Sequence, residues 1–331
     1  MHDNRSKGSK KGRLLIGLVA AMGFTQGAVA ASSLQCAATE LSAPASVSKI
    51  ELMPDTLGVA VESAVNGQRY QILIHRPSAT VKEPPGGFPV LYVLDGNATF
   101  VLAAQAARLQ ERLTGGLIVV GVDAQSNALF DPPARYRDLT TPAADNAWGV
   151  PKDRNGGPLK TGGADAYRDF LVNEVAAVVD GCMHVNKQRT TLFGHSLAGL
   201  FVLHTLLTHP DSYDRYIAAS PSIWWNDRAV LNELSSLRTD RTDRTDRSGG
   251  RKALHLMVGG AEQTLAASAP AVRVDRVTHA AMNDNVQLLY TRLKQEHSDD
   301  VDVALDVFSG ANHVSYLPAA LSAAVTEAAT R

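Results

Sequence analysis

Apolar residues in this chain gather in short runs that are separated by glycine, proline and charged residues. The segments LGVAVESAV and RYQILIHRP flank the turn VNGQ, and together they predict an antiparallel hairpin. The most apolar later run, FPVLYVLDG, has the composition of a strand that is buried on both faces. In all, six later strands are predicted, at residues 88–96, 115–123, 189–196, 215–222, 253–260 and 301–310.

Helical patterns lie between these strands. They cover residues 99–113, 167–183, 197–210 and 284–297, and a last helix begins near Tyr316. Strands that alternate with helices favour βαβ units. We therefore expect an α/β fold with a mostly parallel central sheet, the N-terminal antiparallel hairpin at its edge, and helices on both faces.

Two segments depart from this pattern. Residues 124–163 are rich in Pro, Gly, Asp and Asn, and so long an excursion within a compact domain is usually functional or mobile. Residues 238–247 read RTDRTDRTDR, a charged repeat that has no apolar residue to contribute to a core. We interpret this repeat as a low-complexity surface loop, with a docking tag as the alternative.

The N-terminus has the features of an export signal. Basic residues precede the short apolar run at residues 14–24, and Ala28-Val29-Ala30 forms a small-residue cleavage site before Ala31. This order is typical of a secretory signal peptide over residues 1–30, with an uncleaved anchor as the alternative. We therefore expect an N-terminal arm at residues 31–48, one catalytic domain at residues 49–331, and a periplasmic location without a membrane span.

Composition narrows the classes of partner. The chain of 331 residues has a formal net charge of −1, and removal of the basic leader leaves it mildly acidic, so a nucleic-acid partner is not expected. No Cys/His group has the spacing of metal ligands, and no cofactor motif is present. Cys36 and Cys182 form a disulfide only if the fold brings them together, which the sequence leaves open.

The stretch TTLFGHSLAGLF places one serine at a turn between a predicted strand and a predicted helix. Ser196 is flanked by Gly194 and Gly199, and Ala198 occupies the position where the strict Gly-x-Ser-x-Gly motif has its second glycine. A nucleophile elbow needs this strand–turn–helix context and small neighbours. We identify Ser196 as the candidate nucleophile; the alternative is an ordinary glycine-rich junction.

A serine nucleophile needs a base, which in elbow-containing folds comes last in chain order. His313 follows the last predicted strand in the loop SGANHVSY, whereas His195 is expected to point away from Ser196. Glu262 follows the strand before it and is the candidate acid, with Asp306 as a weaker one. The alternatives are that His313 is an ordinary surface histidine and that Glu262 is a solvated loop acid.

Two backbone amides are expected to stabilise the oxyanion. One belongs to Leu197, directly after the nucleophile, and the other to Asn97 in the loop LDGNATF. Asp95 in the same loop is interpreted as a cap for the turn or the following helix rather than as a chemical group.

Four motifs in this order resemble the α/β-hydrolase family of siderophore esterases. They are PVLYVLDGNA, ARYRDLTTPAA, LFGHSLAGLFVL and AASPSIWW, and the similarity to periplasmic enterobactin and salmochelin esterases covers most of residues 50–325. The resemblance implies hydrolysis of the trilactone of a ferric or free catecholate siderophore, with release of iron. The wider esterase family shares parts of these motifs.

The resemblance also implies that Arg135 binds the anionic substrate. A surface ion pair with a neighbour such as Asp138 is the alternative. Trp224 and Trp225 either line the substrate cleft or pack in the core. Glu262 is a departure, because the periplasmic members are noted for a Ser–His dyad without a third acid.

Two other functions stay open at this stage. A general carboxylesterase for phenolic or acyl esters has the same catalytic residues, and a periplasmic siderophore-binding protein needs none of them. The sequence leaves open which siderophore is cleaved, whether it carries iron, and the oligomeric state.

Overall fold

A computed structural model describes residues 53–239 and 251–330. Several sequence predictions fall outside the described residues. They concern the signal peptide, the arm at residues 31–48, Cys36 and residues 240–247 of the charged repeat. The open question of a Cys36–Cys182 disulfide therefore also lies outside the described residues.

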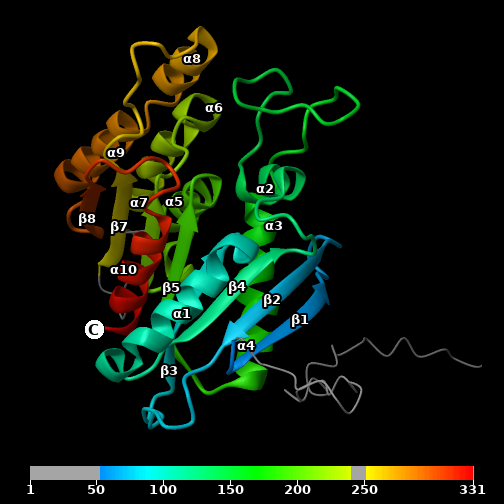
Figure 1. Cartoon of the computed structure of the whole chain (residues 1–331), viewed down its shortest axis with the longest axis vertical. Coiled ribbons are helices and arrows are strands. Elements are labelled where there is room, and N and C mark those ends of the chain that lie inside the picture. The colour runs from blue at the N-terminus through cyan, green and yellow to red at the C-terminus, as the bar shows by residue number, and fades with distance from the viewer. Residues whose placement is uncertain (1–52, 240–250, 331) are drawn as a thin grey trace, which may run out of the picture.

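The described chain forms an eight-stranded, mostly parallel sheet (Figure 1). The order is β1-β2-β4-β3-β5-β6-β7-β8; the β1–β2 and β2–β4 pairs are antiparallel, and all other neighbours are parallel. The predicted N-terminal hairpin is therefore confirmed. The strands are β1 (Thr56–Glu62), β2 (Arg69–His75), β3 (Phe88–Leu94), β4 (Ile118–Ala124), β5 (Val185–His195), β6 (Arg215–Ala219), β7 (Lys252–Gly259) and β8 (Val301–Phe308).

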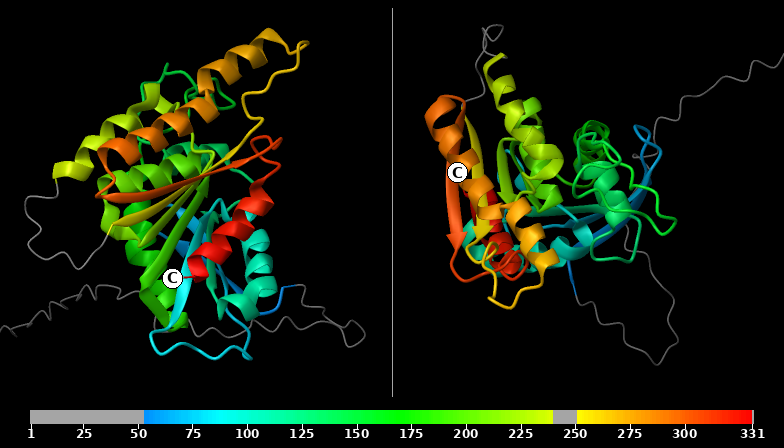
Figure 2. Two further views of the ribbon diagram at one scale, coloured as in Figure 1. Left: turned by 90° about the vertical axis from the view of Figure 1, so that its left-hand side faces the viewer. Right: turned by 90° about the horizontal axis from the view of Figure 1, so that it is seen from above.

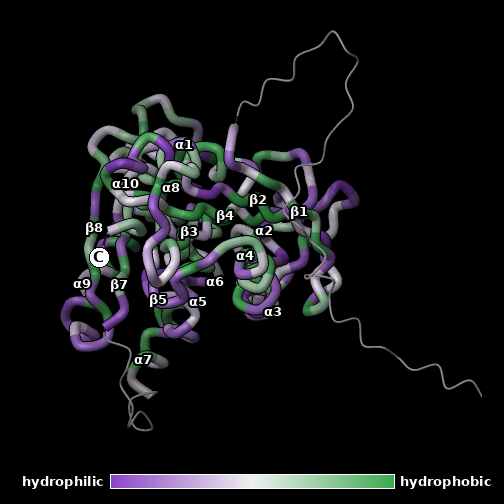
Figure 3. The backbone as a smooth tube through the Cα atoms, turned by 90° about the horizontal axis from the view of Figure 1, so that it is seen from below, coloured by the Kyte–Doolittle hydropathy of each residue, from purple (hydrophilic) through white to green (hydrophobic). Residues whose placement is uncertain are grey.

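Helices cover both faces of the sheet (Figure 2). One face packs against α1 (Gly96–Thr114) and α10 (Leu317–Ala329). The other packs against α5 (Leu197–Thr208), α9 (Met282–Glu296) and the helical run α3 (Ala164–Asp169), η2 (Phe170–Val175) and α4 (Ala176–Cys182). Because helices cover both faces of the sheet, the central strands carry hydrophobic residues on both faces. Figure 3 shows hydrophobic segments at the centre of the molecule.

Strand β3 illustrates this two-sided burial. Leu91 and Val93 belong to the core beneath α1 and α10, whereas Val90, Tyr92 and Leu94 belong to the opposite core, and each is at most 4% exposed. The predicted strands and the long helices are confirmed, with small differences in their ends. The helix predicted at residues 167–183 starts at Ala164 and contains the π-helical turn η2.

Six helical segments were not predicted from the sequence. They are α2 (Pro132–Leu139), η3 (Pro210–Ser212), α6 (Trp225–Arg228), η4 (Ala229–Ser235), α7 (Ser236–Thr239) and α8 (Ala271–Ala280). The helix α7 includes the first two residues of the charged repeat, so the predicted loop over residues 238–247 is wrong at its start. Within the described residues, no helix has the length and apolar character needed to cross a membrane.

Candidate active site

Ser196 lies at a sharp turn between β5 and α5. Its backbone has φ 62° and ψ −118°, a conformation that is costly for a residue with a side chain. The turn is held by hydrogen bonds from the Ser196 amide to the Ala219 carbonyl (2.9 Å) and from the Ser222 amide to the Ser196 carbonyl (3.0 Å). The strand–turn–helix context predicted for a nucleophile elbow is therefore present.

Close packing explains which neighbours of Ser196 must be small. A Cβ on Gly194 would lie 2.2 Å from the Ala198 carbonyl oxygen, and a Cβ on Gly199 would lie 2.9 Å from the Ala219 carbonyl oxygen. The alanine at position 198 fits because Gly194 opposite it has no side chain.

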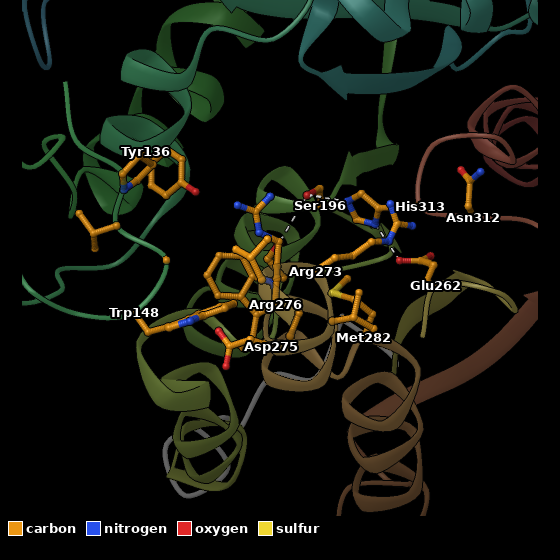
Figure 4. Close-up of a pocket in the computed structure, with 18 of the residues that line it drawn as sticks. Tyr136, Trp148, Ser196, Glu262, Arg273, Asp275, Arg276, Met282, Asn312 and His313 are labelled. Carbon is orange, nitrogen blue, oxygen red and sulfur yellow. Dashed lines mark hydrogen bonds and ion pairs between the residues drawn. The ribbon is translucent and has the colours of Figure 1, made fainter. Parts of the chain in front are cut away.

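Three residues from separate loops meet at this turn (Figure 4). The His313 Nε2 atom lies 3.0 Å from the Ser196 Oγ, and the His313 Nδ1 atom lies 2.7 Å from Glu262 Oε2. The Glu262 side chain is 1% exposed, whereas that of His313 is 39% exposed. A buried carboxylate, an imidazole and a serine hydroxyl in this order form the arrangement that activates serine nucleophiles.

The Glu262 carboxylate is fixed from its other side. Its Oε1 atom accepts hydrogen bonds from the Gly259 amide (2.7 Å) and from the Ser220 hydroxyl, and the Ser220 hydroxyl also contacts that of Tyr316. These contacts leave Oε2 for His313 alone among the groups described. Ser220 in the segment AASPSIWW and Tyr316 in the loop SGANHVSY were not assigned a role from the sequence, because their contacts at Glu262 depend on the fold.

The other candidate base and acid lie elsewhere. The His195 Nε2–H donates to the backbone carbonyl of His313 (2.6 Å), so this ring supports the base instead of replacing it. Burial lowers the pKa of His195 from 6.5 to about 3, with a further contribution from the His313 charge, so the ring is neutral. Asp306 lies 3.1 Å from His255 and not beside His313.

The predicted oxyanion donors have different outcomes. Leu197 is the first residue of α5, where a backbone N–H has no partner within the helix. The Asn97 amide, by contrast, donates to Asp123 Oδ2 at 2.9 Å. A backbone amide has one hydrogen, so the structure contradicts the prediction that Asn97 supplies the second donor.

Arg135 and Trp225 also lie away from the positions predicted for substrate contact. The Arg135 guanidinium makes two hydrogen bonds to Asp95, at 2.7 and 3.0 Å, and its side chain is 14% exposed. Asp138, the alternative partner, pairs with Arg137. Trp225 is 1% exposed and donates to the Thr141 carbonyl, so it is a core residue and its predicted cleft role is wrong.

Trp224 does reach the cleft above Ser196. This cleft has a volume of about 780 Å³, within the range of small-molecule sites. Trp148 contacts Trp224 edge-on at 5.0 Å between ring centroids. The cleft is also lined by Tyr136, Val150, Ser222, Arg273, Asp275, Arg276 and Met282, none of which was singled out from the sequence.

Comparison with known proteins identifies the family. Residues 63–328 match the family described as "Putative esterase". Over 278 residues, the chain is 32% identical to the ferri-bacillibactin esterase BesA of Bacillus subtilis, which covers 82% of this chain and 89% of that protein. The chain belongs to this esterase family.

Two further relatives agree with this assignment. Over 217 residues, the chain is 35% identical to the siderophore enterobactin esterase of Emericella nidulans, covering 61% of this chain and 70% of that protein. The crystal structure of the BES protein from Bacillus cereus matches with a TM-score of 0.71 at 29% identity, covering 86% of this chain and 100% of that one. The chain is therefore an ester hydrolase with an α/β-hydrolase fold.

Proposed function

We propose that this esterase hydrolyses the trilactone ester bonds of a catecholate siderophore and thereby assists release of iron. The observation that carries the proposal is the Glu262–His313–Ser196 hydrogen-bond chain beneath a cleft of about 780 Å³. The cleft offers aromatic rings at Trp148 and Trp224 for aromatic acyl groups. The names of the relatives, which act on siderophore esters, support this substrate class.

The first half of the reaction forms an acyl-enzyme. His313 Nε2 takes the proton from Ser196 Oγ as that oxygen attacks the ester carbonyl. Glu262 holds the proton on His313 Nδ1 and stabilises the imidazolium. The Leu197 amide donates to the developing oxyanion. The imidazolium then protonates the leaving alkoxide, which departs as the alcohol.

The second half repeats these roles with water. His313 removes a proton from a water molecule, which attacks the acyl carbonyl. The imidazolium then returns this proton to Ser196 Oγ as the carboxylic acid is released. In both halves, the oxyanion of the tetrahedral intermediate needs a second backbone amide in addition to that of Leu197. We propose that this second amide belongs to the turn that contains Asp95 and Gly96, because Arg135 connects this turn to the His195 carbonyl next to Ser196.

Product analysis by mass spectrometry tests the proposed substrate. The purified enzyme is incubated with a trilactone siderophore, with and without iron, and with p-nitrophenyl butyrate as a general ester. We expect linearised and monomeric products from the trilactone, at a kcat/KM well above that for the general ester. A strong preference for p-nitrophenyl butyrate would identify a general carboxylesterase instead.

A fluorophosphonate probe tests the catalytic residue separately. We expect covalent labelling of the enzyme at Ser196, and no labelling of Ser196→Ala. A protein that only binds siderophores would not react with the probe.

We further propose that the enzyme works in the periplasm. The basic and apolar pattern of residues 1–30 supports export, with cleavage before Ala31. Mass spectrometry of the N-terminal peptide from a periplasmic extract is expected to find Ala31 first. An intact Met1 in the cytoplasmic fraction would contradict this location.

A further inference from the structure

The helix α8 lies at one end of the molecule (Figure 1), and several of its residues line the cleft. None of its residues is buried, and Val272 is 72% exposed. Its C-terminal end is held by His279, which stacks on Trp148 with ring centroids 3.9 Å apart and an interplanar angle of 23°. Because its sequence is not required for the core, α8 is free to carry residues for recognition.

Two of these residues are arginines that line the cleft. Figure 4 shows the side chains of Arg273 and Arg276 extending from α8 toward Ser196 and His313. Both side chains belong to exposed residues, and neither makes an ion pair within residues 53–239 and 251–330. Burial raises the pKa of Tyr136, another residue of the cleft lining, while the charges of Arg135 and Arg276 act in the opposite direction.

The acidic groups of the cleft do not neutralise this pair. Glu262 already interacts with His313, Gly259 and Ser220. Asp275 is the only acidic residue of α8 and stands against two arginines. The α8 part of the cleft lining therefore carries two positive charges against one negative charge, and an arginine guanidinium suits anionic oxygens.

We propose that Arg273 and Arg276 form an anion subsite on α8 that selects the iron-loaded siderophore over the iron-free form. This inference rests on the proposed function. Catechol oxygens lose their protons when they bind a ferric ion, and three catecholates around one ion leave an excess of negative charge. Free catechols resemble the tyrosine side chain, with a pKa of about 10, and are neutral at physiological pH.

The test compares two substrate pairs, with kcat/KM measured for each member. The first pair is the ferric and the iron-free trilactone. The second is p-nitrophenyl butyrate and the anionic p-nitrophenyl hydrogen glutarate. We expect the wild-type enzyme to prefer the charged member of each pair, and to lose this preference as salt is added because ions screen exposed charges.

Substitution then assigns the preference to α8. We expect Arg273→Gln and Arg276→Gln each to lower the charged-to-neutral ratio about tenfold, mainly through KM, as loss of a hydrogen bond to a charged group does. Arg276→Lys keeps the charge and should retain most of the ratio, and Asp275→Asn should raise it. The control is Arg112→Gln, an exposed arginine in the last turn of α1 outside the cleft.

The outcomes separate the subsite from the proposed function. A wild-type enzyme that cleaves both trilactones equally, or arginine variants that keep the wild-type ratio, would overturn the subsite and leave the function intact. If neither trilactone is cleaved, the proposed function fails, and the nitrophenyl pair still decides whether α8 selects anions. Unchanged circular dichroism of each variant confirms that the fold is retained.

Discussion

The Arg135 guanidinium and the Asp95 carboxylate form a partly buried ion pair with two hydrogen bonds. Arg135 Nε lies 2.7 Å from Asp95 Oδ1, and Arg135 Nη2 lies 3.0 Å from Asp95 Oδ2. The same Nη2 atom lies 3.4 Å from the His195 carbonyl oxygen, one residue before Ser196. The pair therefore ties the turn after β3 to the nucleophile turn after β5.

We expect Arg135→Gln to act through this tie and not through the charge of the substrate. The variant should lose roughly 3–5 kcal/mol of unfolding free energy, because it leaves the Asp95 carboxylate buried without its partner. It should lower kcat for p-nitrophenyl butyrate and for the anionic glutarate ester by the same factor.

Urea denaturation and steady-state kinetics measure these two effects. The control is Arg76→Gln, which removes an exposed pair with Asp55 and should change stability by less than about 1 kcal/mol. A loss confined to the anionic ester would show that Arg135 contacts substrate after all.

Replacement of Glu262 by glutamine tests the third member of the catalytic arrangement. The Gly259 and Ser220 donors face the Oε1 position, so the amide oxygen of Gln must lie there and its NH₂ group must face His313 Nδ1. This reverses the proton arrangement of the imidazole, and Nε2 can then no longer accept a proton from Ser196. We expect kcat to fall about 10⁴-fold, the effect known for the wrong tautomer in such triads.

The comparison uses kcat on one ester substrate. Ser196→Ala should lose about 10⁶-fold, and Asp306→Asn, which alters the neighbour of His255, should keep wild-type kcat. An active Glu262→Gln enzyme would mean that Ser196 and His313 work as a dyad.

His195 is expected to position the catalytic base. Its Nε2–H holds the carbonyl oxygen of His313, so His195→Phe removes the donor while filling the buried space. Since small misplacements of a reacting group cost up to about 10²-fold, kcat should fall by about ten- to a hundredfold with little change in KM. The exposed His184→Gln serves as control, and equal kcat values for both variants would refute the positioning role.

The same histidine affects the stability at low pH. Burial lowers the pKa of His195 from 6.5 to about 3, so between these values the unfolded chain binds a proton that the folded chain does not. The unfolding free energy therefore falls as the pH decreases from 6.5 to 3. The unfolding free energy of His195→Phe, followed by urea denaturation across this window, should depend less on pH than that of the wild type.

Asp123 affects the pH dependence of stability in the opposite direction to His195. Burial raises the pKa of its carboxyl from 3.8 to about 7, although the amides of Asn97 and Ala124 partly stabilise the charged form. Its contribution to stability is complete below 3.8 and is lost as the pH rises through about 7. Thermal melts from pH 4 to 8 should show a smaller decline for Asp123→Asn than for the wild type, and the exposed Asp302→Asn should match the wild type.

Prediction from the sequence worked best where the chemistry follows chain order. Ser196, Glu262 and His313 lie in the segments that follow β5, β7 and β8, and parallel strands bring their carboxyl ends to the same edge of the sheet. The positions of these three residues could therefore be predicted before their distances were known. The helix α8 was not predicted, and because none of its residues is buried in the core, only its position in the fold shows that it lines the cleft.

The sequence by itself determined the alternation of strands and helices, the nucleophile turn and the order of the catalytic residues, because periodicity and small residues near a turn act locally. Only the tertiary structure decided how polar groups are paired. In the folded protein the Asn97 amide donates to Asp123, the Arg135 guanidinium pairs with Asp95, and Arg273 and Arg276 line the cleft. A hydrogen-bond donor can serve a substrate only when no nearer acceptor holds it, and that depends on residues far away in the chain.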